Sequence, residues 1–227
     1  PDGGDVAVGV GSRGIANLPR LVRGVVSGLE ARGYDPFVFP AMGSHGGATA
    51  AGQRAKLDAL GVSAASVGCE IRATMEVTEV GRTPTHDLPV VADANAAAAD
   101  AIVPINRVKP HTDFDGDVES GLSKMLVIGM GKQRGAKVAH EGAVNWSFRE
   151  MIPRLAAIIV DELPVVGGVA VVEDQHDDTA VVEGVPPSAF LEREAQLLER
   201  ASEIMPTLPF DEFDLLIVDR MGKDISG

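Results

Sequence analysis

The sequence contains five histidines, and one of them lies in a glycine-rich segment that could bind a ligand, MGSHGG. Glycines around His45, including Gly46 and Gly47, let the backbone approach a ligand closely and direct N–H groups at an anion. The Ser44 hydroxyl could add a phosphate contact. We expect this turn to follow a strand, at the carboxyl end of a sheet, where open α/β folds bind ligands. The alternative is a tight turn with a solvated His45.

A second histidine lies in the polar segment NRVKPHTDFDGD, directly after a predicted buried strand. Loops that follow buried strands often carry catalytic groups, and His111 here has Lys109 and Asp113 as neighbours. An acidic neighbour could orient the imidazole ring and favour one tautomer. In a chain this acidic, a solvated loop is the alternative interpretation.

The segment ESGLSKMLVIGMGKQRGAKVAH contributes a lysine and a third histidine. Lys124 lies between Leu122 and Met125, and burial among such side chains favours the neutral amine, which can act as a nucleophile or covalent anchor. The alternative is a surface lysine whose stem covers apolar groups. His140 follows sixteen positions after Lys124 and, taken alone, could be an ordinary helix residue.

Several well-known site patterns are missing from the sequence. It has no HExxH, CxxC or EF-hand pattern, no P-loop, no GxSxG turn and no GxGxxG after the first predicted strand. His86 and His176 lie in a Pro-flanked turn and a charged loop, where solvation is expected. The chain's single cysteine, Cys69, excludes an internal disulfide and is consistent with a reducing cytoplasm, which we expect as the location.

The hydrophobic pattern predicts alternating strands and helices. A buried strand at 5–10 precedes a helix that Asn17 could cap, and a second strand at 35–39 leads through the glycine-rich turn into a helix ending near Leu60. Further strands are expected at 72–80, 88–91, 100–105, 165–173, 180–182 and 213–219. Helices are expected at 93–99, from 119, from 145 to 162 and at 187–204, and Asp93 and Asn145 could cap the first and third of them. This order predicts one doubly wound α/β domain with a mostly parallel sheet and helices on both faces.

Composition narrows the class of protein. With 227 residues, 45% of them hydrophobic, the chain can bury a core. We expect residues 1–210 to form the catalytic α/β domain and 211–227 to begin a second, truncated domain. The net charge of −13 argues against nucleic-acid binding, and no uninterrupted apolar run is long enough to span a membrane.

Taken together, four ordered features resemble the lactate racemase family that uses a nickel-pincer nucleotide. They are Arg13 after the first strand, the GSH turn with His45, the Pro-His pair with His111 before Lys124, and His140 beyond it. The stretches MGSHGGATA and NRVKPHTDF…ESGLSKMLVIGMGK also look like a branch of racemase-like homologues. The resemblance runs from about Val8 to the end of the chain.

The resemblance implies a racemase or epimerase that interconverts stereoisomers of a 2-hydroxyacid by hydride transfer to and from the cofactor. Lys124 would hold the cofactor covalently, and His140 would ligate its nickel in a planar geometry that suits Ni(II). His45 and His111 would act as acid and base on opposite faces of the substrate, with Arg13 holding its carboxylate. Cofactor-maturation enzymes are then expected partners.

Two departures from the lactate enzymes bear on the substrate. The thirteen positions from His111 to Lys124 exceed the expected spacing, and Ser12 precedes Arg13 where an acidic residue is usual nearby. A larger 2-hydroxyacid than lactate is therefore expected. Two other functions stay open, a phosphate- or nucleotide-binding α/β protein without nickel, and a three-His hydrolase with a metal-activated water. The sequence does not indicate an oligomeric state.

Overall fold

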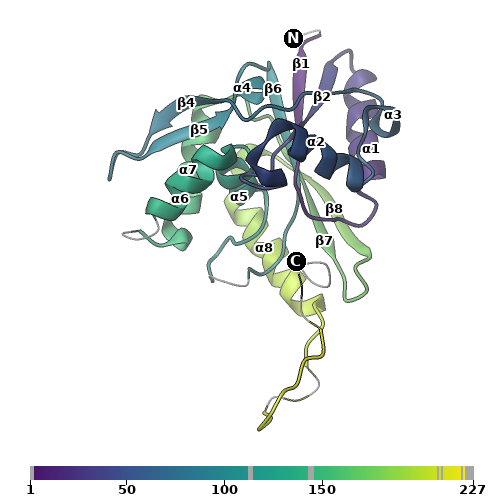
Figure 1. Cartoon of the computed structure of the whole chain (residues 1–227), viewed down its shortest axis with the longest axis vertical. Coiled ribbons are helices and arrows are strands. Elements are labelled where there is room, and N and C mark those ends of the chain that lie inside the picture. Colours follow the sequence, from purple (N-terminus) through teal and green to yellow (C-terminus); the bar gives the residue numbers. More distant parts are fainter. Residues whose placement is uncertain are drawn as a thin grey trace.

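A six-stranded sheet forms the centre of the computed structural model (Figure 1), which describes residues 3–111, 115–142, 146–208, 210, 212–220 and 222. The strand order is β3-β2-β1-β6-β7-β8, and all neighbours are parallel except β8, which runs antiparallel to β7. The strands are β1 (Asp5–Val10), β2 (Asp35–Pro40), β3 (Glu70–Ile71), β6 (Ala101–Arg107), β7 (Gly168–Glu173) and β8 (Thr179–Val185).

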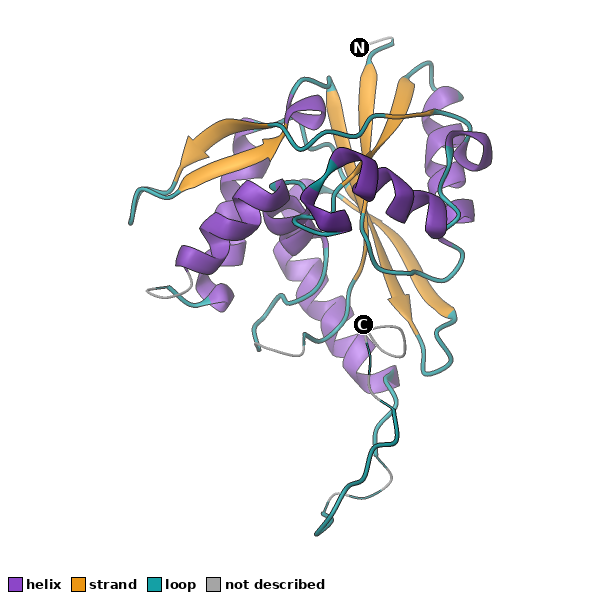
Figure 2. Ribbon diagram, viewed as in Figure 1, coloured by secondary structure: helices purple, strands orange, loops and turns teal. Residues whose placement is uncertain are grey.

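Helices cover both faces of this sheet, which confirms the predicted doubly wound α/β class (Figure 2). One face carries α1 (Leu18–Glu30), α2 (Ala50–Ala59) and α3 (Ala64–Val67). The other carries α4 (Ala94–Ala97), α5 (Leu122–Lys124), the π-helix η2 (Met125–Gly129), α6 (Lys132–Gly142), α7 (Phe148–Glu162), η3 (Pro187–Ala189) and α8 (Phe190–Ile204).

Alternating side chains along the strands explain why both faces are covered. In β1, Val8 and Val10 pack with α1, whereas Ala7 belongs to the core under the second group of helices. The same alternation places Val38 on the first face and Phe37 on the second. Because successive side chains of a strand point to opposite faces, a strand that is apolar at every position needs a layer on each side.

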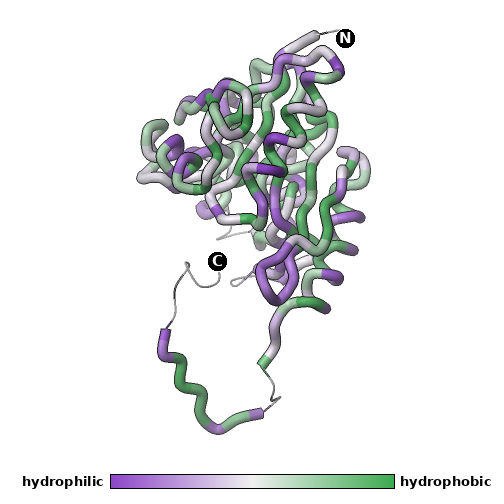
Figure 3. Tube along the Cα trace, turned by 90° about the vertical axis from the view of Figure 1, so that its right-hand side faces the viewer, coloured by the Kyte–Doolittle hydropathy of each residue, from purple (hydrophilic) through white to green (hydrophobic). Residues whose placement is uncertain are grey.

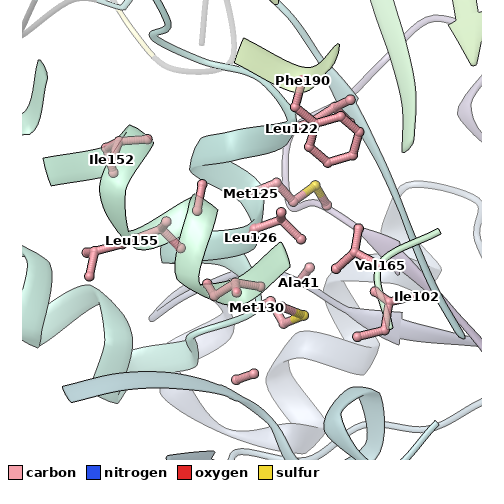
Figure 4. Close-up of a cluster of buried hydrophobic side chains, with 14 of the residues drawn as sticks. Ala41, Ile102, Leu122, Met125, Leu126, Met130, Ile152, Leu155, Val165 and Phe190 are labelled. Carbon is pink, nitrogen blue, oxygen red and sulfur yellow. The ribbon is translucent and has the colours of Figure 1, made fainter. Parts of the chain in front are cut away.

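The larger core holds the helical segment that follows β6. Figure 4 shows Leu122, Met125 and Leu126 packed among Ile152 of α7 and Phe190 of α8, and all five are buried. Burying each of these side chains stabilises the fold by about 1.5–3 kcal/mol before entropy is counted. The segment from 122 to 130 is therefore a fixed part of the domain, and its half-buried residues, Lys124 and Ile128, have a defined place.

A two-stranded antiparallel sheet extends from the domain beside α7 (Figure 1). It consists of β4 (Val77–Arg82) and β5 (Pro89–Asp93), so the strand predicted at 72–80 begins later than expected. Asp93 then caps α4 as predicted, with its Oδ1 accepting from the N–H groups of Asn95 and Ala96.

Two other predicted caps differ in the structure. Asn17 does occupy the N-cap position of α1, but it has a left-handed backbone and its side chain makes no capping hydrogen bond. Its amide instead donates to the hydroxyl of Thr179. Asn145, predicted to cap α7, lies outside the described residues, and Ser147 caps the helix by accepting from the N–H of Glu150.

The prediction of a strand at 213–219 is wrong. The described residues there form no strand, and their apolar side chains are exposed, with Leu215 at 76% and Ile217 at 77%. Figure 3 shows this hydrophobic stretch apart from the body of the domain. A strand needs a partner for its backbone groups, and no sheet edge among the described strands adjoins this segment. The second domain predicted at 211–227 stays a prediction, because much of that range lies outside the described residues.

Among the described residues, no helix has both the length and the apolar character needed to cross a membrane.

Candidate functional site

The loops that follow β1, β2 and β6 carry the predicted catalytic histidines and Arg13. Because β1, β2 and β6 are parallel neighbours, their carboxyl ends lie at one edge of the sheet. Arg13 lies in the loop after β1, His45 in the loop after β2 and His111 in the loop after β6. The structure thus brings these three predicted residues to the edge where α/β sheets bind ligands.

His45 is exposed, and its ring is held from the loop after β1. The hydroxyl of Ser12, itself buried, makes a short hydrogen bond with Nδ1 of His45. This contact leaves Nε2 as the ring nitrogen directed away from Ser12. The Ser12 hydroxyl therefore fixes the orientation of the His45 ring, and no pattern in the sequence indicates this contact.

The two glycines that follow His45 differ in why the fold needs or tolerates them. A side chain on Gly46 would place its Cβ 2.6 Å from the backbone of Gly52 and Gln53, so this glycine lets the short 3-10 helix η1 (Gly46–Ala48) pack against the start of α2. Gly47, like Gly46, has a positive φ but faces open space, and Ser44 is exposed. Gly47 and Ser44 are therefore accessible to a ligand, whereas Gly46 is required by packing.

A buried polar network that no pattern in the sequence indicates contacts the backbone of the loop that carries His45. Lys132 has a side chain only 1% exposed, and its ammonium lies 2.9 Å from Oδ2 of Asp93. It also donates to the carbonyl of Pro40 and, at 3.0 Å, to Oε1 of Gln53. The amide of Gln53 in turn donates to the carbonyls of Gly43 and His45.

Burial acts against the charge of Lys132. Desolvation lowers the pKa of its ammonium, and Asp93 opposes that shift by attraction and hydrogen bonding. Lysines are rarely buried without a partner, and the partner of Lys132 is Asp93. Because these two residues are far apart in the sequence, only the tertiary structure shows that Lys132 is buried. The network connects the first turn of α6 to the loop that carries His45.

The loop with His111 is closed at its base by backbone pairing. Lys109 and Ser120 donate to each other's carbonyls at 3.1 and 3.2 Å, and the amide of Asn106 donates to the carbonyl of Gly121. The N–H of His111 is held by the carboxylate of Glu119. Residues 112–114, which include the predicted neighbour Asp113, lie outside the described part of the chain.

Lys124 lies on the helical segment between these two histidine loops. It is half-buried at the end of α5, beside the apolar residues that the sequence predicted. On one side, the N–H of Gly43 donates to the carbonyl of Gly129. On the other, the closed base of the His111 loop leads directly into Gly121 and α5.

A buried carboxylate fixes the start of α5. Glu194 of α8 accepts from the N–H and the hydroxyl of Ser123, the residue before Lys124. Burial raises the pKa of Glu194, although these hydrogen bonds partly oppose the shift. No local pattern in the sequence signals this contact, because it joins residues 71 positions apart.

His140 lies exposed in the last turn of α6. Its ring packs edge-on against Phe148 at 5.4 Å between centroids. Among the residues that the structure describes, no group of three or more His, Cys, Asp or Glu side chains is placed to hold a metal ion. This finding does not favour the three-His hydrolase, and it leaves His140 as a candidate single ligand.

A hollow of about 500 Å³ opens between α1 and the β7–β8 hairpin, lined by residues such as Arg20, Leu21 and Val182. It contains none of the predicted site residues. The hollow therefore lies apart from the loops that carry the candidate residues.

Comparison with solved structures supports the fold. A lactate racemase apoprotein from Thermoanaerobacterium thermosaccharolyticum superposes with a TM-score of 0.60 at 12% identity, over 85% of this chain and 48% of that one. A Thermotoga maritima protein gives 0.63 at 16% identity, over 88% of this chain and 55% of that one. This chain spans about half the length of each. No family model matches it, and no curated protein matches its sequence.

Proposed function

We propose that this chain is the catalytic domain of a 2-hydroxyacid racemase or epimerase that works with a nickel-pincer nucleotide. The observation that carries the proposal is the position of Lys124, on a fixed helical segment between the two histidine loops. The Gly43–Gly129 hydrogen bond attaches one loop to this segment, and the Asn106–Gly121 hydrogen bond attaches the other. The shared fold with a lactate racemase apoprotein supports the same function.

The donor groups present fit such a cofactor. A nickel ion that receives carbon and sulfur donors from its own nucleotide needs only one protein ligand, and His140 is an exposed imidazole. Lys124, half-buried beside apolar side chains, would hold the nucleotide. When bound, the cofactor supplies a group that accepts a hydride from the substrate and returns it.

The chain's own residues would supply binding and proton transfer. Arg13 would hold the substrate carboxylate, because a guanidinium donates two parallel hydrogen bonds to such a group. His45 and His111 reach the sheet edge on different loops, so one can take the hydroxyl proton of one stereoisomer while the other, already protonated, donates a proton to the hydroxyl of the opposite stereoisomer as it forms. The Ser12 hydroxyl would fix the orientation of the His45 ring.

The test begins with the protein that carries this chain, co-expressed with cofactor-maturation enzymes. We expect stoichiometric nickel and a mass increase on the peptide that contains Lys124. His140→Ala should lose nickel, whereas His45→Ala and His111→Ala should keep nickel nearly intact and lose interconversion of chiral 2-hydroxyacids. His176→Ala, in an exposed hairpin turn, serves as the matched control.

Three results would contradict the proposal. Protein without nickel and without added mass at Lys124 would favour an α/β domain that binds phosphate or nucleotide ligands. Equal metal loss in the His45, His111 and His140 variants would favour a hydrolase with three histidine ligands. Nickel-loaded protein that interconverts none of a panel of chiral 2-hydroxyacids would refute the assigned reaction.

A further inference from the structure

Three basic side chains gather at the carboxyl ends of β1 and β6, in a chain whose overall charge is −13. Arg13 follows β1, Arg107 ends β6, and Lys109 follows two residues later. The two strands are adjacent and parallel, so the loops that leave them lie at one edge of the sheet. The proposed substrate site therefore carries a cluster of positive charges, although the chain as a whole is negatively charged.

One of the three cations is neutralised within the fold. Arg107 forms a short ion pair with Glu173, which ends β7 and is itself buried. The second oxygen of Glu173 accepts from the N–H of Ala16, in the loop that carries Arg13. Glu173 therefore ties together the ends of β1, β6 and β7, and both its oxygens are already in use.

The other two cations have no such partner within the described part of the chain. There, neither Arg13 nor Lys109 has a side-chain hydrogen bond or an ion pair, and both are half-buried. The backbone of Lys109 is fixed by its pairing with Ser120, so the side chain has a defined origin. Asp177 is the further carboxylate that acts on Lys109, but it is exposed on the β7–β8 turn, where water screens it.

The cations also act on one another. Burial lowers the pKa of Lys109, and the charges of Arg107 and Arg13 lower it further, while Glu173 and Asp177 oppose the shift. Repulsion between like charges in a partly desolvated place destabilises the cluster, and an anion bound between the cations would offset this repulsion. The cluster is thus arranged for a negatively charged ligand.

We propose that the site accepts a 2-hydroxyacid with a second anionic group, a carboxylate or a phosphate, which Lys109 binds while Arg13 holds the carboxylate next to the reacting carbon. This inference rests on the proposed function, since it extends the same site. If Arg13 alone held a single carboxylate, Lys109 would have no anionic group of the ligand to pair with, whereas a second anionic group would form that ion pair.

The test measures binding to the cofactor-free protein by calorimetry, so it does not depend on catalysis. The probes are lactate with one acid group, malate with a second carboxylate and 3-phosphoglycerate with a phosphate. We expect malate or 3-phosphoglycerate to bind more tightly than lactate, and the preferred one identifies the second group. Lys109→Gln should weaken binding of that ligand about tenfold or more and change lactate binding little.

Two variants serve as references. Arg13→Gln should weaken all three ligands, because each carries the carboxylate beside the hydroxyl-bearing carbon. Lys137→Gln, which removes an exposed lysine on α6, should change none of them.

Two results would overturn the inference. One is equal affinity of the wild-type protein for lactate and for both doubly anionic ligands. The other is a Lys109→Gln variant that loses lactate and the doubly anionic ligand to the same degree, which would mean that Lys109 shares a single carboxylate with Arg13. Failure of the racemase proposal is separate, because it would show as missing nickel and missing interconversion while this binding pattern persisted.

Discussion

Replacing Lys132 with methionine tests whether the buried network beneath the His45 loop stabilises the domain. Methionine keeps the length of the side chain but removes the charge that faces Asp93. Oδ1 of Asp93 would still cap α4, but Oδ2 would lose the ammonium at 2.9 Å, the one contact described for it. The variant therefore leaves a carboxylate buried in the core without its counter-ion.

The expected loss is large for a single substitution. Removing one partner of a buried ion pair costs about 3–5 kcal/mol, because the remaining charge is uncompensated. The hydrogen bonds from Lys132 to Pro40 and Gln53 are lost as well. Lys132→Met should therefore lower the free energy of unfolding by about 3–5 kcal/mol, a large fraction of the roughly 5–15 kcal/mol typical of a domain.

Urea unfolding at pH 7 measures this loss, with Lys137→Met as the matched control on the same helix. Lys137 is 73% exposed and lies 3.7 Å from Glu141, so its replacement should cost about 0–1 kcal/mol. The double variant Lys132→Met, Asp93→Asn should be less destabilised than Lys132→Met alone, because the stranded charge is gone. If the unfolding free energies of Lys132→Met and Lys137→Met agree within about 1 kcal/mol, the network does not stabilise the fold.

The effect on the loop has its own measurement. Gln53→Leu keeps the Lys132–Asp93 pair but removes the hydrogen bonds to the carbonyls of Gly43 and His45. We expect faster amide hydrogen exchange in residues 43–48 of this variant, while exchange in β1 stays near that of the wild type. Unchanged exchange in the loop would show that Gln53 does not hold it.

Three further predictions concern single contacts. Ser12→Ala should lower turnover of the nickel-loaded protein by about 10–100-fold without loss of nickel, because His45 loses the partner that orients its ring, and steady-state kinetics with metal analysis will show whether it does. Burial raises the pKa of Glu194 above its ordinary value of 4.5, so its contribution to the free energy of unfolding is full below that pH and is lost as pH rises through the raised pKa. Glu194→Gln should remove this pH-dependent loss of stability, and urea unfolding midpoints measured from pH 4.5 to 8 will show whether it does. Thr49→Ala should cost about 1 kcal/mol in thermal unfolding, since the hydroxyl caps α2 by accepting from the N–H of Gly52, and no loss would mean that the cap is unimportant.

Much of the fold could be predicted from local patterns. Apolar runs such as 5–10 and 35–39 indicated buried strands, and the helical spacing of Leu18, Val22 and Val25 indicated an amphipathic helix. Alternation of strands with helices then favours a parallel sheet, and a parallel sheet places every strand's carboxyl end at a shared edge. The loops with Arg13, His45 and His111 could therefore be assigned to one place from the sequence.

What the sequence could not decide were contacts between distant residues and the fate of the last predicted strand. Nothing near Lys132 in the chain indicates that Asp93 neutralises it, and nothing near His45 indicates that Ser12 holds its ring. The apolar segment 213–219 has a strand's composition, yet its structure depends on whether another strand lies beside it. Side-chain pattern is a property of a segment, whereas pairing, burial of charge and ring orientation depend on which segments the fold brings together.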